Sequence, residues 1–160
     1  MKACWIVETR HDSFATRPRP SEGIALSDPI QPDDPEVRKV CERLDEYLAQ
    51  LRQAGEEQQG VVGHAMNLAH ARLIQDYGSV AGYREARRDE QFKFLNQLDG
   101  VVRRLEATHL GMSWGFRIYW MYARLLMESD PTIASRYWPD VARLGKKGAG
   151  LGDTEPKQGT

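Results

Sequence analysis

The stretch LGMSWGFRIYWMYARLL, residues 110–126, narrows the possible folds more than any other part of the chain. Plotted as a helix, it is covered almost all round by apolar and aromatic side chains. The narrow polar sector holds Arg117, Arg124 and Glu128, and the last two stand four positions apart, a spacing that suits an ion pair. The arginines interrupt the apolar run before it reaches the roughly 20 residues of a membrane span. We therefore predict a central, buried helix whose polar sector faces water, a paired acid or a bound anion.

Amphipathic helices precede this segment. The first begins at Asp34-Pro35, because aspartate caps a helix and proline suits its first position. It ends near Gly55, and its apolar face consists of Val37, Val40, Cys41, Leu44, Leu48 and Leu51. The second runs from about Glu57 to Tyr77, with the stripe Val62, Ala65, Met66, Ala69, Leu73 and Tyr77. Gly78-Ser79 should end this helix and cap the next.

The third helical segment, residues 80–109, contains a conflict in its pattern. Its second half has a clear apolar stripe: Phe94, Leu95, Leu98, Val101, Val102 and Leu105. The same phase, extended backwards, places Arg84, Arg87 and Gln91 on the buried face. Burying arginines is costly unless each is paired. Either the helix breaks around REARRDEQ, or its first half projects beyond the core.

The projecting alternative would present Arg84, Arg87 and Arg88 to a partner. In the other alternative, this stretch is a solvated charged turn. Its local counter-ions are then Glu85, Asp89 and Glu90. A charge run does not decide between the two readings.

The end of the chain carries further helix signals. We expect Gly111 to end the third helix and Ser113 to cap the fourth. Asp130-Pro131 should start a fifth helix, and Pro139 should end, kink or restart it, with a short final helix from Pro139 to about Leu144.

These elements predict an all-α, single-domain bundle of about five or six helices, residues 35–145. An irregular, proline-rich N-terminal arm, residues 1–34, precedes it, with at most one short strand at ACWIVETR. We expect this arm to lie on the body of the protein or on a partner. Residues 146–160 are rich in glycine and polar residues, and we predict a disordered tail.

Charge is unevenly distributed, although the net charge is only −1. Residues 1–60 carry 8 basic and 12 acidic side chains, whereas residues 101–147 carry 8 basic and 4 acidic ones. Either the two regions neutralise each other when packed, or the basic half forms a contact surface. The candidate phosphate contacts in that half are Arg103, Arg104, Lys146 and Lys147.

The sequence shows no catalytic or metal-binding constellation, and we expect no cofactor and no metal. Glu106 and His109 form a single ExxH, whereas a di-iron bundle needs two, with further glutamates. His109 aligns with the apolar stripe and should point inwards, as a hydrogen-bonded core histidine. If the chain were an enzyme, His109 or His70 would be its acid or base. Cys41 lies on an apolar face and should be a buried, unreactive thiol.

We therefore predict a non-enzymatic helical binding protein that docks on a larger protein or ribonucleoprotein complex as adaptor, inhibitor or small subunit. The candidate partner-binding residues are Arg84, Arg87, Arg88, Arg117 and Arg124. Direct nucleic-acid binding through the basic C-terminal half is the alternative, and a homodimer through the apolar fourth helix also remains open. With two cysteines, no signal-peptide pattern and no membrane span, the expected location is the cytoplasm.

Overall fold

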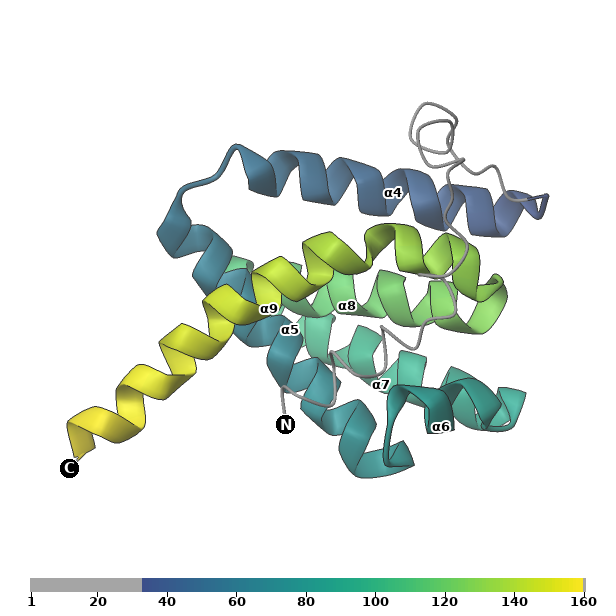
Figure 1. Cartoon of the computed structure of the whole chain (residues 1–160). Coiled ribbons are helices and arrows are strands. Elements are labelled where there is room, and N and C mark those ends of the chain that lie inside the picture. Colours follow the sequence, from purple (N-terminus) through teal and green to yellow (C-terminus); the bar gives the residue numbers. More distant parts are fainter. Residues whose placement is uncertain (1–32, 160) are drawn as a thin grey trace, which may run out of the picture.

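The computed structural model describes residues 33–159 of the 160-residue chain, and side chains up to residue 150. In this range the chain forms six α-helices and no strand, so the predicted all-α bundle is confirmed (Figure 1). The helices are labelled α4 to α9. The arm predicted for residues 1–34, with its candidate strand, lies outside the described residues except for Asp33 and Asp34.

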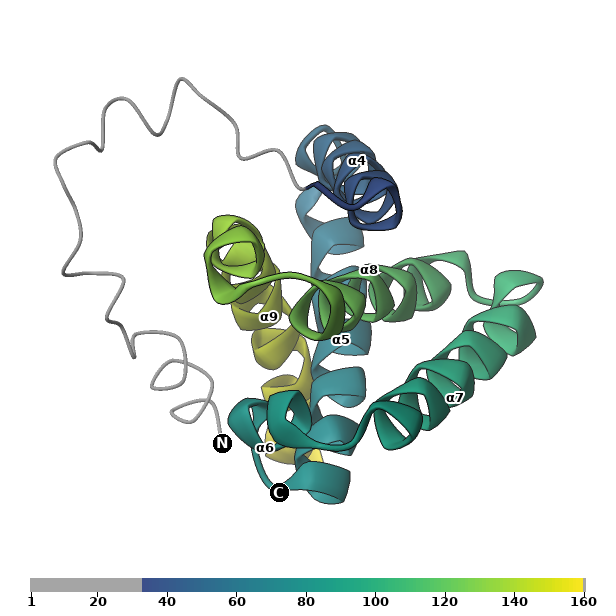
Figure 2. The ribbon, with the colours of Figure 1, turned by 90° about the vertical axis from the view of Figure 1, so that its right-hand side faces the viewer.

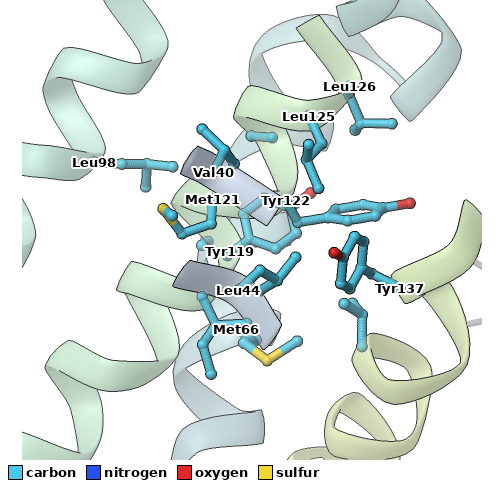
Figure 3. Packing of buried hydrophobic residues seen from close by; sticks show 14 of the residues in the cluster. Val40, Leu44, Met66, Leu98, Tyr119, Met121, Tyr122, Leu125, Leu126 and Tyr137 are labelled. Atoms are coloured by element: carbon cyan, nitrogen blue, oxygen red, sulfur yellow. The ribbon is translucent and has the colours of Figure 1, made fainter. Parts of the chain in front are cut away.

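Helix α8, Leu110–Glu128, is the centre of the molecule. It packs against α4, α5, α7 and α9, and it crosses between α4 and α7 (Figure 2). Figure 3 shows its Tyr119, Met121 and Tyr122 packed among Leu44, Met66 and Tyr137 from three other helices. The prediction of a buried central helix is confirmed. Because its apolar sides are covered by the same chain, α8 offers mainly its polar sector to any other molecule.

Helices α4, Pro35–Arg52, and α5, Glu56–Tyr77, agree closely with the sequence pattern. The Asp34 carboxylate accepts a 2.9 Å hydrogen bond from the backbone N–H of Glu36, so the predicted cap is formed. All six residues predicted for the apolar face of α4 are buried. Helix α5 ends at Gly78, whose φ of 85° is a left-handed conformation that glycine adopts without strain.

The third helical segment is broken, which resolves the conflict in its pattern. Helix α6, Val80–Glu85, is separated from α7, Arg88–Glu106, by two residues with extended backbone. The buried Gln91 side chain donates hydrogen bonds to the carbonyl oxygens of Tyr83, at 2.6 Å, and Arg84, at 3.3 Å. Both carbonyl groups lie in the last turn of α6, where the helix itself leaves hydrogen-bonding capacity unused. These hydrogen bonds explain how Gln91 can lie on the buried face. The break leaves Arg84 and Arg87 exposed, so neither has to be buried.

The predicted start of α8 is wrong. The helix begins at Leu110, directly after His109, so Gly111 lies inside it. Ser113 does not cap the helix; its buried hydroxyl donates to the carbonyl oxygen of Leu110 at 2.8 Å, within the first turn. Leu110 is 60% exposed, so the apolar pattern gave no sign that the helix reaches back that far.

The predicted end of the bundle also differs. Asp130 caps the last helix as expected, since its carboxylate accepts from the backbone N–H of Thr132 at 2.7 Å. Helix α9 then runs unbroken from Pro131 to Gly159, and the separate short helix from Pro139 to Leu144 is wrong. Pro139 is exposed, so the backbone hydrogen bond that it removes can be replaced by water. The predicted disordered tail, residues 146–160, begins inside this helix.

Helices α5 and α9 cross at very close range. A Cβ atom added to Gly63 of α5 would overlap the backbone carbonyl oxygen of Leu144 in α9. A Cβ atom added to Gly148 of α9 would in turn overlap the α5 backbone at Gly63 and His64. Two glycines thus allow the two backbones to touch, and they fix α9 against the rest of the bundle.

Candidate functional site

The most distinctive concave surface lies over α8, between α4 and α7. Both of these helices pack on α8, but they diverge from each other (Figure 2). The cleft that remains has a volume of about 440 Å³. It is lined by Arg43 and Tyr47 of α4, by Asp99, Val102, Arg103 and Glu106 of α7, and by Arg117, Trp120 and Met121 of α8.

The floor of the cleft is aromatic and well fixed. The indole N–H of Trp120 donates a 3.0 Å hydrogen bond to the carbonyl oxygen of Leu95 on α7. The ring of Tyr47 packs edge-on against Trp114, with 4.6 Å between ring centroids. Because both rings are held by neighbouring helices, this surface is ready for contact without further ordering.

Arg117 connects the three walls of the cleft. Its guanidinium forms an ion pair with Glu106 of α7 and lies 5.9 Å from the centroid of the Tyr47 ring. It also donates to the Tyr47 hydroxyl at 3.3 Å. Of the three environments predicted for the polar sector of α8, the structure shows the paired acid at Arg117. The side chain remains 34% exposed, so it can still reach a ligand in the cleft.

The second arginine of the sector is paired as well. Arg124 Nε lies 3.3 Å from Oε2 of Glu128, which confirms the predicted i,i+4 pair. The other carboxylate oxygen of Glu128 lies 3.3 Å from Nη2 of Arg88 on α7. Glu128 is only 11% exposed and is shared by two guanidinium groups. These two arginines therefore tie the start of α7 to the end of α8.

The remaining predicted partner-binding arginines lie at the corner between α6 and α7. Arg87 forms an exposed 2.9 Å ion pair with Asp89, one of the local counter-ions that the sequence suggested. Arg84 is exposed and beside a second pocket of about 440 Å³, formed with Glu85 and the end of α8. The structure thus divides the five predicted arginines between the polar sector of α8 and this corner.

The predicted phosphate contacts do not form one continuous surface. Arg103 pairs with Asp99 at 2.8 Å, and Lys147 pairs with Glu56. Arg104 and Lys146 are exposed, but they lie on α7 and α9, which pack mainly on different helices, α8 and α5.

Sequence reasoning missed the α4 wall of the cleft. Arg43 lies off the apolar face of α4, where an ordinary solvent-facing arginine is expected, yet it lines the cleft. Among the described residues it has no ion-pair partner, unlike Arg103 and Arg117 opposite. The one sequence signal for this wall is Tyr47, an aromatic residue at the edge of the apolar stripe of α4. The rest could not be predicted locally, because the cleft depends on how three separate helices are arranged.

Neither histidine predicted as a possible acid or base, His70 or His109, lines the cleft. His109 is exposed at the turn before α8, so the prediction that it points inwards is wrong. Helix α7 ends at Glu106, and His109 therefore leaves the phase of the apolar stripe. His70 is buried instead, with Nδ1 3.1 Å from the Tyr119 hydroxyl, and burial lowers its pKa to about 3. The imidazole is therefore neutral near neutral pH.

Cys41 matches its prediction of a buried thiol. It is 5% exposed, and desolvation raises its pKa, which makes the reactive thiolate less accessible. No group of three or more histidine, cysteine, aspartate or glutamate side chains is arranged to hold a metal ion among the residues described.

Fold and site together define an all-α bundle with an arginine-lined, aromatic-floored cleft. Comparison with protein-family models, curated proteins and solved structures finds no match. Within the described residues, none of the helices combines the length and the apolar character needed to cross a bilayer.

Proposed function

We propose that the chain is a non-enzymatic helical binding protein that docks on a larger protein or ribonucleoprotein complex, as adaptor, inhibitor or small subunit. The observation that supports this is the cleft between α4 and α7, with a fixed aromatic floor and the lining residue Arg43, which has no ion-pair partner among the described residues. Arginine and large aromatic residues provide most of the binding energy in many protein interfaces. A cavity of this volume accommodates several side chains of a partner.

The chemistry of the lining favours binding over catalysis. The cleft contains no histidine, serine, threonine or cysteine among its lining residues. Its carboxylates, Asp99 and Glu106, are each held in an ion pair with an arginine. Both carboxylates therefore already have partners within the cleft.

The same lining favours a protein partner over nucleic acid as the direct contact. Asp99 and Glu106 stand beside the arginines and leave the lining with only one net positive charge, too little to balance the continuous charge of a phosphate backbone. A mixed set of charges suits a protein surface that has both signs. The proposal includes a cytoplasmic location, supported by the free, buried thiol of Cys41, which suits a reducing compartment.

The test is recovery of partners from source lysate on the tagged full-length chain, with and without nuclease. We expect a protein partner in stoichiometric amount that survives nuclease and is lost with Arg43→Glu. The matched control is Arg104→Glu, which makes the same charge change at an exposed site on α7 outside the cleft lining. Both variants should keep the circular dichroism and thermal midpoint of the wild type.

Three outcomes would contradict the proposal. Recovery of nucleic acid without a stoichiometric protein, lost with nuclease, would favour direct nucleic-acid binding. A partner retained equally by Arg43→Glu and Arg104→Glu would move the contact away from the cleft. No retained partner under either condition would remove the support for a binding protein.

A further inference from the structure

We propose that the cleft is occupied by an acidic segment of the same chain, residues 21–33, SEGIALSDPIQPD, so that the protein covers its own docking surface. This inference rests on the proposed function for its biological meaning, but the contact itself can be tested independently. The occupant is identified by its charge, by the length of chain outside the described residues and by the point where that chain joins the bundle.

Charge is the first argument. The acidic segment has three carboxylates, Glu22, Asp28 and Asp33, and no lysine or arginine. The cleft lining has three arginines and two acids, an excess of one positive charge. The excess belongs to Arg43, which has no ion-pair partner among the described residues, whereas Arg103 and Arg117 each have one. A carboxylate from the acidic segment would complete the pairing.

The two paired arginines can also accept a second acid. A guanidinium has five N–H donors, so one carboxylate does not saturate it. The side chain of Arg103 is 77% exposed even with Asp99 bound, and that of Arg117 is 34% exposed. Their free donors therefore remain available from the open side of the cleft.

Reach is the second argument. The acidic segment joins the bundle at Asp34, directly before the helix that forms one wall of the cleft. At about 1.5 Å per residue along α4, Arg43 lies roughly 14 Å from this point. Asp28 precedes Asp34 by six positions and can span about 20 Å when extended. It can thus reach Arg43, and Glu22 can reach further, to the arginines of α7 and α8.

The segment would run back along α4, antiparallel to it. Pro29 and Pro32 favour extended backbone, which suits a strand of chain lying in a groove. Ile24, Leu26 and Ile30 supply apolar side chains for the floor formed by Trp120 and Met121. Because the segment is tethered, its effective concentration is in the millimolar range, and weak contacts suffice to hold it.

The experiment places a nitroxide spin label on the full-length chain and reads the indole N–H signals of its tryptophans by NMR. Cys4→Ser removes one native thiol, and Ser27→Cys provides the labelling site next to Asp28; Cys41 is buried. We expect selective loss of the Trp120 signal, whereas Trp138 on α9, packed against Tyr122, keeps its intensity. Arg43→Glu, Asp28→Lys or high salt should each restore the Trp120 signal.

Matched variants make the test specific. Glu8→Lys, which changes the charge by the same amount outside the acidic segment, should leave the Trp120 signal broadened. Combining Arg43→Glu with Asp28→Arg should restore the broadening that either change alone removes. Equal intensities for Trp120 and Trp138, or broadening that Arg43→Glu does not relieve, would overturn the proposal.

Mixing labelled chain with isotope-enriched, unlabelled chain separates contact within one molecule from contact between copies. Broadening in the mixture would show a second copy in the cleft and would also overturn the proposal.

The proposed docking function and the proposed self-contact can fail independently. A protein partner lost with Arg43→Glu but no spin-label effect would leave only the docking function. The spin-label effect without a protein partner would leave only the self-contact. If both hold, Asp28→Lys should increase partner recovery.

Discussion

The two sides of the central helix differ in how tightly their neighbours close over it. On one side, α5 and α9 cross with their backbones in contact at Gly63 and Gly148. On the other side, α4 and α7 both pack on α8 but diverge, and charged side chains line the opening. The closed side excludes everything but the chain itself, whereas the open side leaves polar groups within reach of another molecule.

This contrast separates the residues that hold the fold from those available for binding. At the closed side, a methyl group added at Gly63 or Gly148 must displace backbone, and the imidazole of His70 on α5 is buried and neutral near neutral pH. At the open side, side chains end in partly exposed ion pairs, which contribute little to stability and can be exchanged for others. Substitutions should therefore affect folding on one side and binding on the other.

The largest effect at neutral pH is expected for Gly63→Ala. The new methyl group would overlap the carbonyl oxygen of Leu144, and backbone cannot move away as a flexible side chain could. We expect a loss of about 2–3 kcal/mol in the free energy of unfolding, measured by urea denaturation with circular dichroism.

Gly60→Ala, three residues earlier in α5, is the matched control. Its added Cβ would meet Lys147 only at 3.8 Å, an ordinary contact. Replacing a mid-helix glycine by alanine should then stabilise the protein by about 0.5–1 kcal/mol. Equal effects of the two substitutions would mean that α5 and α9 are not in backbone contact.

The next effect concerns acid stability and comes from His70. Burial lowers its pKa in the folded state from 6.5 to about 3, so the unfolded chain binds a proton over this range that the folded chain does not. The free energy of unfolding should therefore fall as pH decreases from 6.5 towards 3, by about 1.4 kcal/mol per pH unit from this group. Above pH 6.5 the contribution is constant.

His70→Gln removes this titration while keeping a polar group beside Tyr119. Denaturation curves at pH 7, 6, 5 and 4 should give a shallower decline for this variant than for the wild type. A His70→Gln profile parallel to the wild type would show that the imidazole is not buried in the folded protein.

The sequence was most informative where local chemistry decides the structure. Asp34 and Asp130, each followed by proline, marked two helix starts correctly, because capping involves only neighbouring residues. Pro139 misled because its effect depends on tertiary context. It lies on an exposed face of a helix that Val141 and Leu144 anchor in the core, so the helix continues through it.

The candidate site was less accessible to sequence reasoning. The polar sector of α8 and its pair between Arg124 and Glu128 followed from helical spacing. The contribution of Arg43 did not, since nothing local distinguishes it from an ordinary solvent-facing arginine. Its role arises only because α4 and α7 diverge over α8, and that divergence is set by the packing of the whole bundle.

The smallest effects are expected for ion pairs, and they should differ between the nearly buried carboxylate of Glu128 and the more exposed carboxylate of Asp99. Glu128 is 11% exposed and bound to two arginines, so Glu128→Gln leaves Arg88 and Arg124 without their shared acid. Arg124 Nε is buried and makes no hydrogen bond within the described residues, which adds to the cost of losing the charge. We expect a loss of about 1 kcal/mol in the free energy of unfolding, kept modest because Arg88 remains 58% exposed to water.

Asp99→Asn is the comparison. It breaks the exposed pair with Arg103 and should change the free energy of unfolding by less than about 0.5 kcal/mol. If Asp99→Asn proved as costly as Glu128→Gln in urea denaturation, the walls of the cleft would be part of the structural core, and their availability to a partner would be in doubt.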